Sequence, residues 1–122
     1  MINLLDETKE ILLNHGKHYE DIEFVVGLSS SSEEYLRWGS HSNDELARTT
    51  WDEFAAQANK NYDNGFGGTE VLEVTMIVGK DFWLERHEYD GSEWWEYKEL
   101  PKAENYSEGS IRVFNSDYDF EE

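Results

Sequence analysis

The spacing of hydrophobic positions near the start of the chain predicts a helix. Apolar residues recur at helical intervals between residues 3 and 15, on a stripe that includes Leu5 and Leu12. Asn3 is placed to cap the first turn, and Gly16 follows the last turn, where a glycine commonly ends a helix. The pattern therefore predicts a first helix over residues 3–15.

Alternation of apolar and polar residues predicts strands farther along the chain. Residues 21–28 alternate with period two, which is typical of a strand with one buried face. Residues 34–39 predict a short second strand that pairs with it as a hairpin. Residues 70–79 are the most apolar stretch and predict a central strand.

A second helix is predicted between these strands. Thr50 and Glu53 form a capping-box pattern, and apolar residues such as Phe54 then recur at helical spacing over residues 51–62. The apolar stripe of this helix is expected to lie on the sheet. A similar capping pattern at residues 42–45 predicts a separate short turn that leads into the helix.

Two aromatic-rich segments, 82–89 and 93–100, predict a hairpin. Asp90 and Gly91 lie between them and form the strongest turn signal in the chain. Pro101, the only proline, is expected to end the second strand.

The sequence leaves the register of this hairpin open between two alternatives. A two-residue loop pairs Arg86 with Trp95 and His87 with Trp94, whereas a three-residue loop with a glycine bulge pairs His87 with Glu93. In both registers each face of the hairpin carries aromatic and charged residues. One face is expected to pack under the helices, and the other is expected to face solvent.

The whole chain, residues 1–122, is predicted to form a single α+β domain. Its order of elements predicts an antiparallel sheet of about five strands with two helices packed on one face. Residues 111–114 are expected to add a last edge strand, and an acidic tail begins at about residue 115.

The composition adds a strong charge asymmetry to this picture. Ten Lys and Arg residues face 28 Asp and Glu residues, so the formal net charge is −18. Such a surface repels phosphate backbones and anionic lipids, which predicts no direct nucleic-acid binding and no membrane binding. It attracts basic proteins. The alternative is that the acidity only keeps the protein soluble.

The location is predicted from what the sequence lacks. The chain has no cysteine, which excludes disulfides and zinc–thiolate sites and favours the cytoplasm. The first residues do not resemble a signal peptide, and no apolar run approaches the length of a membrane span.

The hairpin is the predicted partner-binding region. Tryptophans are typical anchors of protein interfaces, and carboxylates around them would pair with Arg and Lys. The alternative is that the aromatic residues only stiffen the sheet through cross-strand pairs. The predicted partner-binding residues are Glu85, Glu88, Asp90, Glu93, Trp94, Trp95 and Glu96.

Catalysis and metal binding receive weaker support from the residues. His87 with a neighbouring glutamate is a conceivable acid–base pair for a small hydrolase, but the four histidines are scattered along the sequence. Residues 59–70 match a calcium-binding loop only partially, with Asp63 and Glu70 as weak candidate ligands. The sequence therefore predicts no catalytic residues, no enzyme activity and no cofactor.

The segments "YDNGFGGTEV" and "IVGKDFWLERHEYDGSEWWEYKELP" resemble small, acidic, uncharacterised proteins of phages, plasmids and integrative elements of Gram-positive bacteria. The likeness covers roughly residues 50–101. It implies an accessory role on mobile DNA, such as anti-CRISPR or anti-restriction activity by mimicry of DNA. The resulting hypothesis is an inhibitor of a basic nucleic-acid-binding host defence protein. The alternative is an immunity or antitoxin protein that neutralises a basic nuclease toxin.

Overall fold

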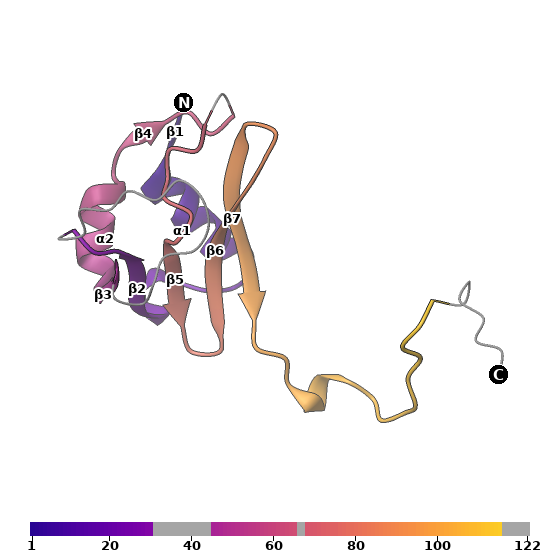
Figure 1. Cartoon of the computed structure of the whole chain (residues 1–122). Helices are drawn as coiled ribbons and strands as arrows, with labels where there is room; N and C mark the ends of the chain where they lie inside the picture. Colours follow the sequence, from indigo (N-terminus) through magenta and orange to yellow (C-terminus); the bar gives the residue numbers. More distant parts are fainter. Residues whose placement is uncertain (31–44, 66–67, 116–122) are drawn as a thin grey trace.

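The computed structural model describes residues 1–30, 45–65 and 68–115 of the chain (Figure 1). Short 3₁₀ turns at Tyr19–Asp21 and Ala103–Asn105 accompany the regular elements. The helices and strands are β1 (Ile2–Asn3), α1 (Leu4–Asn14), β2 (Ile22–Leu28), β3 (Leu46–Thr49), α2 (Trp51–Ala58), β4 (Asn61–Tyr62), β5 (Met76–Gly79), β6 (Phe82–Tyr89) and β7 (Ser92–Glu99).

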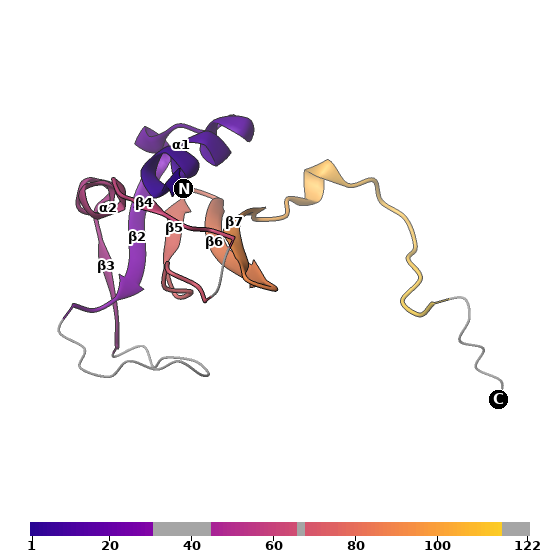
Figure 2. The same ribbon diagram turned by 90° about the horizontal axis from the view of Figure 1, so that it is seen from above.

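The main sheet has five strands in the order β3-β2-β5-β6-β7, and every neighbouring pair is antiparallel. A separate two-stranded ribbon joins β1 to β4. Both helices lie on the same side of the sheet, as Figure 2 shows from above. The predicted α+β class, with two helices on one face of an antiparallel sheet, is therefore confirmed.

The hydrophobic core fills the space between the helices and this face of the sheet. Ile77 and Leu84 at its centre are fully buried, and truncating such a side chain to alanine typically costs about 2–5 kcal/mol. Gly79 approaches the Phe82 ring so closely that a Cβ there would collide with it. The buried cluster consists of Leu12, Val25, Phe54, Ala58, Ile77, Phe82, Leu84 and Trp95.

The ends of α1 match the signals in the sequence. The Asp6 N–H donates to the Asn3 side-chain oxygen at 3.0 Å, so Asn3 is the N-cap. Gly16 adopts a φ of 73°, and its N–H donates to the Leu13 carbonyl at 3.0 Å. The next N–H, of Lys17, reaches the Leu12 carbonyl at 2.8 Å. This pair of bonds is a Schellman ending, whose positive φ favours glycine at position 16.

Two predicted elements are shorter than expected. The second helix ends at Ala58, because Tyr62 pairs with Ile2 in the β1–β4 ribbon. The strand predicted over residues 70–79 begins only at Met76. The N–H groups at positions 70 and 71 donate to a glutamate carboxylate instead of to a neighbouring strand.

In the described structure, β2 pairs with Leu46–Thr49, immediately before α2, and with β5. Residues 34–39, the predicted hairpin partner, lie outside the described residues, as do residues 42–44 of the predicted turn. The sequence did not predict the four-residue strand β3.

The prediction of a final strand at residues 111–114 is wrong. The described residues after β7 contain one 3₁₀ turn and otherwise no regular element, and they lead away from the sheet (Figure 1). Ile111 and Val113 are 84% and 76% exposed, so they pack against no sheet in the described part of the chain.

Candidate functional site

The register of the β6–β7 hairpin decides which residues share a face. Asp90 and Gly91 have φ angles of 53° and 88°. Positive φ at both central positions is the mark of a two-residue type I′ turn. Tyr89 therefore pairs with Ser92, and His87 pairs with Trp94. Of the two registers left open by the sequence, the one with the two-residue loop is observed.

This register distributes the seven predicted partner-binding residues over different environments. Glu93 and Trp95 point toward the helices and are each 3% exposed. Glu88 and Asp90 are exposed near the tip of the hairpin. Strand alternation places Glu85, Trp94 and Glu96 together on the opposite, helix-free face of the sheet, which we call the open face.

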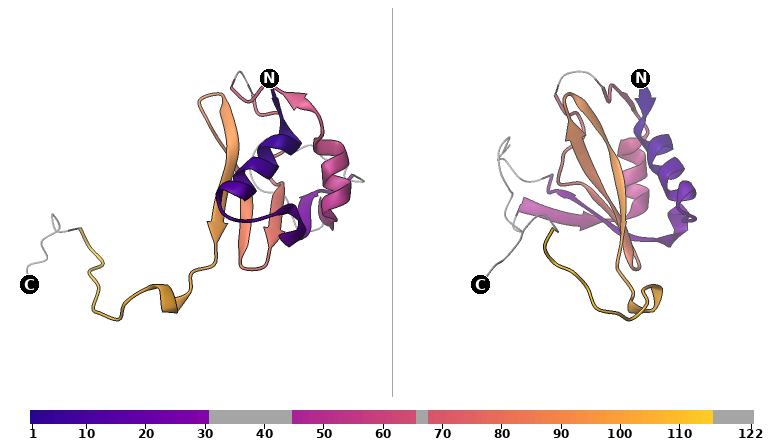
Figure 3. Two further views of the ribbon diagram at one scale, coloured as in Figure 1. Left: turned by 180° about the vertical axis from the view of Figure 1, so that it is seen from behind. Right: turned by 90° about the vertical axis from the view of Figure 1, so that its right-hand side faces the viewer.

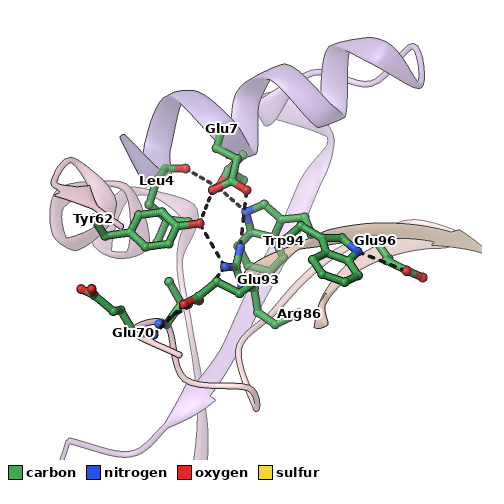
Figure 4. A network of polar contacts seen from close by, with 11 residues as sticks. Leu4, Glu7, Tyr62, Glu70, Arg86, Glu93, Trp94 and Glu96 are labelled. Atoms are coloured by element: carbon green, nitrogen blue, oxygen red, sulfur yellow. Dashed lines mark hydrogen bonds and ion pairs between the residues drawn. The ribbon is translucent and has the colours of Figure 1, made fainter. Parts of the chain in front are cut away.

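The buried side of the hairpin holds an ion pair between Arg86 and Glu93. Arg86 Nη2 donates to Glu93 Oε1 at 2.8 Å and to the Tyr62 hydroxyl at 3.1 Å (Figure 4). The Glu93 carboxylate also accepts the N–H groups of Glu70 and Val71, at 2.7 and 3.1 Å. Glu93 therefore fixes the segment before β5 against the hairpin.

A second carboxylate, that of Glu7 on α1, completes this network. The Tyr62 hydroxyl donates to Glu7 Oε1 at 2.6 Å, and Arg86 Nη1 lies 3.8 Å from Glu7 Oε2. Burial raises the pKa of Glu7, and the Tyr62 hydrogen bond and the Arg86 charge oppose this shift. Burial also raises the pKa of Tyr62 to about 12. One guanidinium thus serves two carboxylates from different elements.

The Arg86 guanidinium also lies over an aromatic ring. Its Cζ is 4.7 Å from the centroid of the Trp95 ring, a distance typical of a cation–π contact. The Trp95 indole N–H in turn donates to Thr8 Oγ1 at 2.8 Å. The buried side of the hairpin is therefore joined to α1 through Trp95 as well as through Arg86.

On the open face, tryptophans hold two glutamates in place. Trp83 Nε1 donates to Glu85 Oε1 at 2.8 Å, and Trp94 Nε1 donates to Glu96 Oε2 at 3.2 Å. His87 Nε2 lies 2.7 Å from Glu85 Oε2 and 3.7 Å from Glu96 Oε1. Each indole thus orients the carboxylate two residues farther along its own strand.

The two glutamates are direct cross-strand partners. Like charges opposite one another disfavour strand pairing. His87 lies between them, and Lys98 Nζ lies 3.4 Å from Glu96 Oε1. The hydrogen bond from Trp83 and then that from His87 lower the pKa of Glu85, and the bond from Trp94 is the main cause that lowers the pKa of Glu96. Both carboxylates therefore stay ionised to lower pH than an ordinary glutamate.

Apolar side chains continue the open face beyond the hairpin. Val78 is the cross-strand partner of Trp83, and Met76 is the partner of Glu85. Phe24 and Val26 follow on β2 as partners of Val78 and Met76. All four of these aliphatic and aromatic side chains are only partly buried. The open face therefore combines an apolar strip with an acidic strip that remains about one-third exposed at its two glutamates.

Among the described residues, the weak metal candidates Asp63 and Glu70 do not gather with further ligands. The Asp63 side chain accepts the Gly65 N–H at 3.1 Å, and Glu70 is exposed. Within residues 1–30, 45–65 and 68–115, no group of three His, Asp or Glu side chains is arranged to hold a metal ion. His87 and Glu85 do lie within hydrogen-bond distance, which is the contact that an acid–base pair requires.

The sequence contained a signal for the buried network that was not used. In the two-residue register Glu88 pairs with Glu93, and Arg86 lies two residues before Glu88, so Arg86 and Glu93 are diagonal neighbours on one face. That face also carries Phe82 and Leu84, which favours its burial. Glu7 and Tyr62 gave no such signal, because only the tertiary fold brings them to Arg86.

No family model, curated protein or solved structure matches this chain. None of the helices in the described part of the chain combines the length and apolar character needed to cross a membrane. The case for any function therefore rests on the chemistry of the hairpin and its neighbours.

Proposed function

We propose that this chain is a non-enzymatic acidic protein that binds a basic, nucleic-acid-binding host defence protein and blocks its access to DNA or RNA. The observation that carries the proposal is the pairing of Glu85 with Glu96 on the open face, where the indole N–H groups of Trp83 and Trp94 donate to the two carboxylates and orient them. A net charge of −18 gives the same electrostatic preference to the whole chain.

The pairing of Glu85 with Glu96 does not stabilise the fold, which favours a role in binding. Opposed like charges on adjacent strands weaken a sheet, and among the described residues the contacts of both carboxylates stay within the β6–β7 hairpin, whose strands are already paired. Each carboxylate oxygen can accept more than one hydrogen bond, so the indole contacts leave capacity for a guanidinium. Oriented carboxylates lose little freedom on binding, which favours affinity.

The acidic surface extends from the open face to the tip of the hairpin. Glu88 and Asp90 are exposed there, beside a loop that carries Asp63 and Glu70. A hydrogen bond of 2.8 Å from the Glu93 N–H to the Asn64 carbonyl holds this loop next to the hairpin. A basic channel built to receive the closely spaced phosphates of nucleic acid would meet several carboxylates at once.

The proposed contact surface therefore differs from the set predicted from the sequence. Glu93 and Trp95 support it from beneath and do not reach a partner, because each is 3% exposed. Trp83 joins the set because it orients Glu85. The proposed contact residues are Trp83, Glu85, Glu88, Asp90, Trp94 and Glu96.

The test is a charge reversal with a matched control. Glu85→Lys/Glu96→Lys changes the open face, and Glu104→Lys/Glu108→Lys makes the same change in net charge on the exposed segment after β7. Each protein is used to capture basic proteins from host lysate at low and moderate salt, and captured nucleases are then challenged with duplex DNA. We expect the open-face variant alone to lose at least about tenfold in affinity, with DNA competing for the same complex.

Equal losses in the two variants would contradict the proposed site, because they would mean that only total charge matters. A complex that DNA does not displace, or that does not weaken as salt rises, would contradict the proposed mode of inhibition.

A further inference from the structure

Strand β7 is an edge strand, and its outer side carries no neighbouring strand. It is last in the order β3-β2-β5-β6-β7 and pairs only with β6. Figure 3, in its right-hand view, looks onto this edge and shows no other described segment lying across it. An exposed edge of this kind presents a row of backbone donors and acceptors to any extended chain.

Two hydrogen bonds establish which backbone groups of β7 point outward. The Leu100 N–H donates to the Asp81 carbonyl at 2.7 Å, on the side of β6. The Glu93 N–H donates to the Asn64 carbonyl at 2.8 Å, on the opposite side. Backbone groups alternate in direction along an antiparallel strand. The groups beyond the Asn64 contact that point away from β6 are therefore the N–H and C=O of Trp95, Tyr97 and Glu99.

The same chain carries a strand-like segment that has no sheet. Ile111 and Val113 alternate with Arg112 and are 84% and 76% exposed in the described structure. Residues 109–115 contain one arginine and no acidic residue, although the net charge of the whole chain is −18. Alternating β-branched residues in an extended segment favour strand formation, provided that a partner edge exists.

We propose that residues 110–114 of one copy of this protein add as a strand to the β7 edge of a second copy, over Trp95–Glu99, and that two copies exchange these segments reciprocally. The five residues of the segment match the five residues of the edge in length. Arg112 would approach an edge that carries Glu96. The interface runs along this edge and shares only Glu96 with the proposed contact surface, so it goes beyond the proposed function.

The path of the chain favours a second copy as the acceptor. After β7, Pro101 and the turn at Ala103–Asn105 direct the chain away from its own sheet (Figures 1 and 3). Exchange of identical segments gives a closed two-fold dimer, in which each copy both donates and receives a strand.

Electrostatic repulsion opposes this dimer and gives it a distinctive salt dependence. Two copies with a charge of −18 each repel one another, and salt screens this repulsion. Dimerisation is therefore expected to strengthen as salt rises. Binding of a basic partner is expected to weaken under the same conditions, so the two proposals fail independently.

The test is the mass of the full chain in solution, measured by sedimentation equilibrium across protein concentrations in low salt and in about 0.5 M NaCl. Val113→Pro removes the N–H of the donated segment, with Val113→Thr as its matched control. Glu99→Pro removes an outward N–H of the edge and leaves the ladder to β6 intact, with Glu99→Ala as its control. We expect a salt-strengthened wild-type dimer, at least about tenfold weakened by each proline and little changed by each control.

Three results would overturn the proposal. A wild-type chain that stays monomeric in both salts, or a dimer that both prolines leave intact, would each exclude the exchange. A monomer in which Val113→Pro increases the hydrogen exchange of the Tyr97 amide would show that the segment docks on its own edge instead.

Discussion

Glutamates on the two faces of the β6–β7 hairpin differ in burial and in the residues that they contact. On the side of the helices, Glu93 is buried and accepts hydrogen bonds from Arg86 and from two backbone N–H groups of another segment. On the open face, Glu85 and Glu96 accept hydrogen bonds from side chains of the hairpin itself. Within the described residues, the buried carboxylate joins distant parts of the chain, whereas the exposed carboxylates contact neighbours in their own hairpin.

The tryptophans repeat this difference. The Trp95 indole donates across 87 positions of sequence to Thr8 on α1. Trp83 and Trp94 donate to glutamates only two positions away. One residue type thus holds the fold together on one face and arranges a surface on the other. The buried set should therefore control stability, and the open set should control recognition.

Removal of Arg86 is the strongest way to test this division. Arg86→Met leaves Glu93 buried without its counter-ion, and breaking a buried ion pair in this way costs about 3–5 kcal/mol. The free energy of unfolding, measured in urea, should fall by that amount. Arg48→Met on β3 is the matched control, because Arg48 is exposed, and it should change stability by less than about 0.5 kcal/mol. Equal effects would remove the distinction between the two faces.

Adjacent tryptophans give the next largest contrast. Trp95→Phe removes core volume and the hydrogen bond to Thr8, and it should lower stability by about 1–3 kcal/mol. Trp94→Phe alters only the half-buried open face and should cost less than about 1 kcal/mol. Thermal unfolding followed by near-ultraviolet circular dichroism would compare them. A larger loss for Trp94→Phe would reverse the assignment of the faces.

The contribution of the partly buried Glu7 to stability should depend on pH, and this dependence tests the buried side of the hairpin. The folded-state pKa of Glu7 lies above its ordinary value of 4.5, so the native state holds this proton more tightly than the unfolded chain. Deprotonation therefore removes stability as the pH rises through 4.5 toward the folded-state pKa. The stability of wild type relative to Glu7→Gln should fall across this window. Urea unfolding at a series of pH values checks the slope, and a rising difference would contradict it.

The pH dependence of stability that Glu85 contributes should have the opposite sign to that of Glu7 and should be the smallest of these effects. Its folded-state pKa lies below 4.5, so its stabilising contribution is present above pH 4.5 and is lost as the pH falls through the folded-state pKa. Wild type should exceed Glu85→Gln by less than about 1 kcal/mol above that range, because solvent screens an exposed pair. The same urea series measures it. A difference that grows as the pH falls would show that the Trp83 and His87 contacts do not favour the charged carboxylate.

Local signals predicted the elements and the hairpin well. Asn3, Gly16 and Thr50 marked helix ends through contacts with neighbours in the sequence, and these contacts form in any context where the helix forms. Asp90 and Gly91 predicted the turn for the same reason. The register stayed open because both loop lengths satisfy the turn chemistry.

Features set by tertiary contacts were harder to predict. The apolar run at residues 70–79 favoured one long strand, but Glu93, more than 20 positions away, takes the N–H groups of Glu70 and Val71. The seven predicted partner-binding residues formed one set that mixed both faces of the hairpin, because alternation alone did not show which face the helices cover. Arg86 lies on the covered face, where composition alone favours an exposed arginine.

The two-residue turn at Asp90-Gly91 decides which side of β7 is acidic. Side chains alternate strictly along β7, so a slip of the existing residues to the three-residue loop would move β7 by one position relative to β6 and turn each of its side chains to the other face. Trp95 and Glu93 would then emerge into solvent, while Glu96 would be forced against α1. The acidic strip of the open face therefore exists only in the register that this turn selects.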